Sequence, residues 1–446
     1  MSDLQSSRGD ATRRLLQLLV QRDGGDEGWP PAAAASDWKT LAETCDNHQL
    51  IPLVYCRLKQ LPAPTIPSEL LDYLRVRFHE SCSYNYRLAS KLVELTSMLE
   101  SEGVRVLNFK GPSLAMAVYG GLSLRQCLDL DLIIRTDQVV KGAKLMKSWG
   151  YEPTPTPARP QLSPYWCRPE NSRHIDRGKE IQYLSPDGAF YVDLHWQFAD
   201  RFWRPFSPDV EKLWERAVKQ HLPQGSVFTP CREDLFLALC AHGTRHRWWC
   251  LKWLVDVAEI LRKADALDWS RIEEMTKTRP GVGAAASVAA SLARDLLEVP
   301  VPGEAKRILP ATDRTRALAS AIQQELLSRG YSSGDEHTTL LALEGRPAAR
   351  MNYRAARVAR YPESLFRQII AEIGPKDRRL IRLPRKLEFL YHFIRPARLV
   401  LTRSLRIART FWAAGGGVKL LRSPLREMPR QQVSPPQSKL DTSARN

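Results

Sequence analysis

Long apolar runs, a secretory leader and paired cysteines are all missing from this sequence. No window approaches roughly 18 uninterrupted apolar residues, the length that crosses a bilayer, so we expect no membrane-spanning helix. The first residues lack the apolar core of a signal peptide. The eight cysteines are scattered, without a CxxC pair or a zinc-binding spacing, and we expect reduced thiols. These absences predict a cytoplasmic protein without structural disulfides or a zinc finger.

Positive charge is abundant but confined to one end of the chain. The 446 residues suffice for two or three domains, and the hydrophobic content of 43% and charged content of 26% are ordinary globular values. The net charge is +17, and residues 346–446 contain 23 Lys and Arg against 6 Asp and Glu. Residues 1–345 are therefore formally neutral. We expect any attraction to nucleic acid or to an anionic membrane surface to reside in residues 346–446.

Two aspartates separated by a single leucine, Asp129 and Asp131, lie near the end of a largely apolar stretch that runs from Val104 to Ile134. Because side chains alternate faces along a strand, Asp129 and Asp131 should project from the same face. Two adjacent carboxylates repel each other unless a divalent cation lies between them. A later strand-like run, AFYVDLHWQF, adds Asp193 as a third candidate. Three carboxylates on two neighbouring strands predict a site for two Mg²⁺ ions, which would stabilise the attacking and leaving oxygens of a phosphoryl transfer.

The hydrophobic patterning predicts an α+β protein with a small mixed β-sheet. Residues 1–102 are expected to be helical, and residues 103–207 to form the sheet core, in which strands and helices alternate. Residues 208–330 are predicted to be a helical domain. Residues 331–446 are expected to form a basic extension that contains an amphipathic helix and a disordered tail.

Two histidines four residues apart lie in the predicted helical domain. Residues 232–263 are expected to form two helices with a kink at Gly243. His242 and His246 have a spacing that can bind zinc on one helix face, but Gly243 weakens that helix and the glutamate of an HExxH motif is absent. The sequence therefore favours a substrate-facing role for these histidines over a metal site.

The central stretch resembles the DNA polymerase β-like nucleotidyltransferase superfamily. Within it, the chain is similar to bacterial nucleotidyltransferase family proteins that have a KG…R…DLDL core followed by a DLHW strand. The matching residues are Lys110, Gly111, Arg125, Asp129, Asp131, Asp193, Leu194, His195 and Trp196. The resemblance covers roughly residues 35–265 and includes the run that contains the two histidines. One departure is that Pro112 separates Gly111 from Ser113, whereas Gly-Ser is usually contiguous.

The resemblance implies a nucleotidyltransferase core that moves a nucleoside monophosphate from an NTP, with ATP expected, to an acceptor hydroxyl. Asp129 and Asp131 would bind both Mg²⁺ ions, and Asp193 would bind the catalytic ion and help to take the hydroxyl proton. The nucleotide phosphates would be bound by Lys110, Gly111, Ser113 and Arg125. His195 is expected to be a structural histidine or a partner of Asp193.

Two other interpretations remain open from the sequence. One is a degenerate nucleotidyltransferase fold that only binds a nucleotide or a partner, although the presence of all three aspartates argues against it. The other is an adaptor that acts at a membrane surface or on RNA through residues 346–446, in which case the protein would be cytoplasmic but peripheral to a membrane. No motif in the sequence identifies the acceptor.

Overall fold

The computed structural model describes residues 2–20, 35–60, 66–154, 178–309, 311–329 and 336–359. The chain divides into two compact units, residues 1–347 and residues 348–446. The amphipathic helix expected in residues 386–412 and the tail that follows it lie outside the described residues. None of the described helices combines the length and the apolar character that crossing a bilayer requires.

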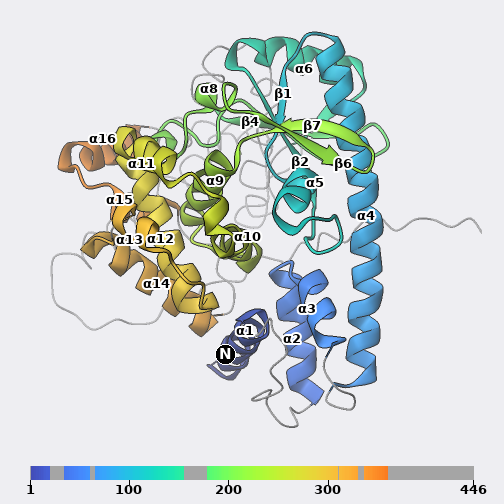
Figure 1. The fold of residues 1–446 in the computed structure, drawn as a ribbon, viewed down its shortest axis with the longest axis vertical. Coiled ribbons are helices and arrows are strands. Elements are labelled where there is room, and N and C mark those ends of the chain that lie inside the picture. Colours follow the sequence, from blue (N-terminus) through green and yellow to red (C-terminus); the bar gives the residue numbers. More distant parts are fainter. Residues whose placement is uncertain are drawn as a thin grey trace, which may run out of the picture. The chain divides into compact units, whose positions relative to one another are not determined.

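The α+β class is confirmed, because a five-stranded mixed sheet is preceded and followed by helices (Figure 1). The order of strands across the sheet is β1-β2-β5-β4-β3. β2 and β5 are parallel, and the other neighbouring strands are antiparallel. The strands span Val106–Asn108 (β1), Asp129–Ile134 (β2), Glu152–Pro153 (β3), Glu180–Leu184 (β4) and Tyr191–His195 (β5).

One face of the sheet packs on a long helix and forms the core. In β2, Leu130, Leu132 and Ile134 are fully buried on this face, as period-two alternation requires. They pack with leucines of α4 (Ser68–Ser101), whose 34 residues contain neither Gly nor Pro. Figure 1 shows α4 extending from the sheet region down past α3 to the level of α2. The opposite face of β2 and β5 therefore carries the polar residues of the alternating pattern.

Helices make up most of the other residues that the structure describes. Before the sheet lie α1 (Ser2–Val20), α2 (Ala35–Asn47) and α3 (Ile51–Leu58); between its strands lie α5 (Gly111–Leu114), the π-helix η1 (Ala115–Tyr119), the 3₁₀ turn η2 (Thr136–Gln138) and α6 (Val139–Ser148). After the sheet lie η3 (Arg204–Phe206), α8 (Val210–Leu213), α9 (Arg232–Arg245), α10 (Leu251–Arg262), η4 (Ala264–Ala266), α11 (Trp269–Thr278), α12 (Pro280–Leu297), α13 (Gly303–Ile308), α14 (Asp313–Arg329), α15 (Glu336–Leu343) and α16 (Pro347–Ala359).

A β-hairpin interrupts the region that the sequence predicts to be helical, residues 208–330. It consists of β6 (Val218–Leu222) and β7 (Gly225–Thr229), which pair antiparallel around a two-residue turn. Gly225 has a φ of 154°, which a side chain rarely adopts. The sequence around the hairpin, VKQHLPQGSVFT, has strand-forming residues on both sides of a Pro-Gln-Gly turn, so this signal was present and was overlooked.

The helix break in residues 232–263 is not at Gly243. α9 continues through this glycine to Arg245, and the chain then turns at Arg247 and Trp248, which have positive φ values of 54° and 55°. Gly243 is required because the indole of Trp248 lies against it, and a Cβ there would come within 2.3 Å of the ring. The expected kink is therefore wrong, and the glycine is a packing residue.

Candidate active site

The three aspartates lie on the sheet face that is turned away from α4. Asp131 of β2 stands directly opposite Asp193 of β5 in the parallel register, and Asp129 lies two residues earlier on the same face. Donor atoms of Asp131, Asp193 and His195 all lie within 4.8 Å of one another, whereas Asp129 is not a member of that group. All four residues line a cavity of about 580 Å³, a volume typical of small-ligand sites.

His195 is closer to the carboxylate cluster than the sequence suggested. Its Nε2 lies 3.0 Å from Oδ1 of Asp131, and its Nδ1 lies 3.1 Å from Oε2 of Glu180. The partner of Asp193 is instead Gln182 of β4, whose Nε2 donates to Oδ1 of Asp193 over 2.9 Å. Parallel pairing of β2 with β5 explains this arrangement, since β5 is shared between β2 and β4.

The electrostatics of the cluster favour a bound cation. Burial and the charge of Asp129 raise the pKa of Asp193 to about 7, and burial and the charge of Asp131 raise the pKa of Asp129. Burial acts in the same direction on Asp131, but Lys110 and His195 outweigh it and hold its pKa below the usual range. Carboxylate oxygens are the ligands that Mg²⁺ prefers, and a divalent cation would relieve the repulsion among these groups. The residues present therefore fit a metal site.

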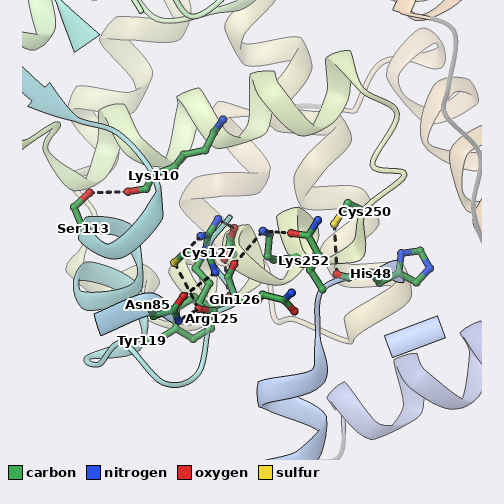
Figure 2. Close-up of polar contacts among 12 residues, drawn as sticks. His48, Asn85, Lys110, Ser113, Tyr119, Arg125, Gln126, Cys127, Cys250 and Lys252 are labelled. Carbon is green, nitrogen blue, oxygen red and sulfur yellow. Dashed lines mark hydrogen bonds and ion pairs between the residues drawn. The ribbon is translucent and has the colours of Figure 1, made fainter. Parts of the chain in front are cut away.

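The loop after β1 packs against β2 and places Lys110 beside the carboxylate of Asp131. Gly111 has a φ of +59°, and a Cβ there would lie 3.0 Å from the carbonyl oxygen of Asp129. Glycine therefore allows the loop to approach β2 closely. Lys110 extends into the cavity and its Nζ lies 3.3 Å from Oδ1 of Asp131. Ser113 is fully buried, and its hydroxyl donates to the carbonyl oxygen of Lys110 over 2.9 Å, away from the cavity (Figure 2).

Arg125 borders the cavity, but its guanidinium is engaged in a buried ion pair. Its Nε and Nη2 donate to the two carboxylate oxygens of Asp256 in α10, over 2.9 and 3.0 Å. The hydroxyl of Tyr119 also donates to Asp256, over 2.8 Å. The pair joins the loop before β2 to the helical region 131 residues further along the chain. Asp256 therefore holds the guanidinium of Arg125 in place, and the phosphate-binding role of Arg125 stays a prediction.

Asn85 fixes the loop that leads into β2. Its Nδ2 donates to the carbonyl oxygens of Leu122 and Arg125 over 2.6 and 2.7 Å, and its Oδ1 accepts from the backbone N–H of Cys127 over 3.1 Å. Figure 2 shows Asn85 beside Arg125 and Cys127. Asn85 is fully buried in the middle of α4. A polar residue inside an otherwise apolar helix face was the only signal of this role in the sequence.

Lys252 is a further cavity residue that sequence reasoning missed. It lies in the first turn of α10 and is 7% exposed. Its Nζ donates to Oε1 of Gln49 and, over 3.1 Å, to the carbonyl oxygen of Gln126 (Figure 2). Gln49 follows α2 and has a φ of 56°, a strained conformation of the kind that collects at functional sites. The amino-terminal helices thereby contribute a side chain to the cavity.

His242 of α9 and His246, which directly follows this helix, both line the cavity. The rings of His242 and His246 are 4.7 Å apart, and His242 also lies 4.7 Å from the indole of Trp253 in α10. Among the described residues, neither histidine belongs to a group of three or more side chains that could hold a metal ion. The arrangement agrees with the substrate-facing alternative.

The sequence match is decisive for the family. Residues 34–298 match the model of a family described as "Uncharacterised nucleotidyltransferase". The chain belongs to this family. The match covers more than half of the nucleotidyltransferase, from the start of α2 to the end of α12, and includes every aspartate of the site. No curated protein matches the chain, and no solved structure matches it.

Proposed function

We propose that the protein is a Mg²⁺-dependent nucleotidyltransferase that moves a nucleoside monophosphate from an NTP, with ATP as the first candidate, to an acceptor hydroxyl. The observation that carries this proposal is the pairing of Asp131 with Asp193 on adjacent parallel strands that face a large cavity, with Asp129 on the same face. Membership of the nucleotidyltransferase family supports the reaction class. One buried and two half-buried acids in one cleft are costly for the fold, which supports a role in catalysis.

Each acidic side chain has a distinct part in this proposal. Asp131 and Asp193 would hold metal ions, and Asp129 would complete the ligand set. Bound Mg²⁺ would neutralise phosphate charge and align the acceptor hydroxyl with the α-phosphate. Asp193 would also help to take the proton of the acceptor hydroxyl. His195, held between Asp131 and Glu180, would fix the orientation of the Asp131 carboxylate.

The phosphates would lie against the loop after β1. Gly111 lines the cavity and lets the loop lie close to β2, and Lys110 supplies an ammonium group beside the metal site. We assign Arg125 and Ser113 to positioning rather than to phosphate binding, because Asp256 and the carbonyl oxygen of Lys110 already engage their polar groups.

The experiment that tests this function is incubation of cell extract with each α-labelled NTP, Mg²⁺ and the purified protein. Wild type should label an acceptor, and Asp131→Asn should label nothing. Asp137→Asn is the matched control, because Asp137 is 75% exposed and lies in the turn after β2. Equal labelling by wild type and Asp131→Asn, or none by either, would favour the binding-only alternative.

The basic carboxy-terminal segment supports a second, additive role. Its excess of 17 positive charges would draw a cytoplasmic enzyme to an anionic membrane surface or to nucleic acid. Sedimentation of the full chain with phosphatidylserine vesicles or with RNA, across a salt series, tests this role. Binding to neither at low salt would leave the segment as a solvated surface.

A further inference from the structure

One wall of the cavity carries positive charge that the proposed chemistry has not used. Arg245 and His246 at the end of α9 line this wall, together with His242 one turn earlier. Lys179, immediately before β4, lines the cavity as well. Lys179 is paired with its neighbour Glu180, which also contacts His195. The wall therefore lies next to the metal-binding carboxylates.

Arg245 has hydrogen-bond donors that are not used by any described residue. Its Nε donates to Oε2 of Glu336 over 3.1 Å, and its two Nη atoms have no partner among the described residues. The other oxygen of Glu336 lies 2.9 Å from Nδ1 of His246. Glu336 is the first residue of α15 and is itself 37% exposed. The carboxylate of Glu336 thus contacts both Arg245 and His246, two cavity residues that could otherwise bind an anion.

His242 lies among several cations. Burial and the neighbouring Lys110, His246, Arg245 and Lys179 hold the pKa of His242 well below its usual range. No hydrogen bond is made by either ring nitrogen to another described residue. Each of the three cations around His242 is already paired with one carboxylate, Lys110 with Asp131, Lys179 with Glu180 and Arg245 with Glu336. A further anion would therefore have to displace one of these carboxylates, and Glu336 is the most exposed of the three.

We propose that Arg245, Lys179 and His242, together with Lys110, form the subsite for the polyphosphate tail of the nucleotide, and that Glu336 occupies this subsite until the nucleotide displaces it. The inference rests on the proposed function, because it names where the leaving pyrophosphate binds. Lys110 links the two sites: its Nζ lies 3.3 Å from the metal-binding Asp131, and its charge also acts on His242.

A polyphosphate fits this wall better than an acidic acceptor does. An α-phosphate held at Asp131 and Asp193 would direct the β- and γ-phosphates into the same cavity, which Lys110, Lys179 and Arg245 also line. Pyrophosphate carries several negative charges, and the wall offers several cations rather than one.

The test is calorimetric titration with inorganic pyrophosphate in EDTA, so that the metal site makes no contribution. We compare wild type with Glu336→Gln and Arg245→Met. Arg247→Met is the matched control, because Arg247 pairs with Glu325 over 2.7 Å and does not line the cavity. Glu336→Gln should bind pyrophosphate on the order of tenfold more tightly, and Arg245→Met on the order of tenfold more weakly. Arg247→Met should bind as wild type does.

Unchanged pyrophosphate affinity in both Glu336→Gln and Arg245→Met would overturn the proposal. Normal pyrophosphate binding by Arg245→Met, with loss of transfer to the acceptor, would also overturn it and place an acidic acceptor at this wall. Thermal unfolding of each variant shows whether it is folded, and Arg245→Lys provides a second variant that keeps the charge. The expected titration pattern without any nucleotidyl transfer by wild type would support the subsite while the proposed function fails.

Discussion

Replacing Asp193 by Asn should make the protein more stable and inactive at the same time. The substitution keeps the size of the side chain and an oxygen that can accept from Gln182, while it removes one charge from the crowded cluster. The pKa of Asp193 is raised from 3.8 to about 7, chiefly by burial and by the charge of Asp129. The folded protein therefore holds a proton on Asp193 that the unfolded chain releases more easily.

The size of this stability change follows from the thermodynamic linkage between protonation of Asp193 and folding. Each pKa unit corresponds to about 1.4 kcal/mol, so keeping Asp193 ionised costs the folded state on the order of 4 kcal/mol above pH 7. Because the folded pKa is the higher one, wild type loses this stability as the pH rises from about 4 to about 7. Asp193→Asn escapes the loss, and about half of it, roughly 2 kcal/mol, should appear as added stability at pH 8.

The assay is urea unfolding at pH 4.5 and pH 8, in EDTA and again with MgCl₂ or MnCl₂. In EDTA, the stability of Asp193→Asn should exceed that of wild type at pH 8, with a much smaller difference at pH 4.5. The metal should stabilise wild type and not Asp193→Asn, since a bound ligand raises the free energy of unfolding. Asp137→Asn serves as the exposed control and should respond to metal as wild type does.

Two results would refute this reasoning. The first is an Asp193→Asn protein that is less stable than wild type at pH 8 in EDTA, which would mean that the carboxylate is not under electrostatic strain. The second is equal stabilisation of both proteins by metal, which would remove Asp193 from the metal site.

Three further substitutions probe the positioning contacts by urea unfolding. Arg125→Met leaves a buried carboxylate unpaired and should lower the free energy of unfolding by about 3–5 kcal/mol; a loss below 1 kcal/mol would contradict the ion-pair role. Asn85→Leu removes three hydrogen bonds from the loop before β2 and should lower the free energy of unfolding by about 2–4 kcal/mol. It should also weaken the stabilisation that added metal gives. Unaltered stabilisation by metal would mean that the loop does not position β2. Gly243→Ala should lower the free energy of unfolding by about 2 kcal/mol or more, because its methyl group would meet the Trp248 ring. Gly121→Ala is the control, because a Cβ at Gly121 meets no atom within 4 Å. Equal stability of the two variants would mean that Gly243 does not pack against Trp248.

The local parts of the site could be predicted from the sequence. The alternation of Asp129, Leu130 and Asp131 fixes that the two carboxylates share a face, because neighbouring side chains of a strand point to opposite sides. The same alternation places Asp193 and His195 together in β5. The α+β class follows from hydrophobic patterns of similarly short range. The concentration of positive charge in residues 346–446 can be counted directly in the sequence.

The partners across the site were decided by the tertiary structure alone. Pairing of Asp131 with Asp193 requires β2 and β5 to be adjacent and in register, and local sequence does not specify which strands pair. Arg125 could be recognised as a cation but not as the partner of a carboxylate 131 residues away. Lys252, Arg245 and Glu336 reach the cavity only because α10, α9 and α15 pack there. Local backbone preferences act over a few residues, whereas the closing of this cavity depends on contacts between segments far apart in the chain, which no single segment encodes.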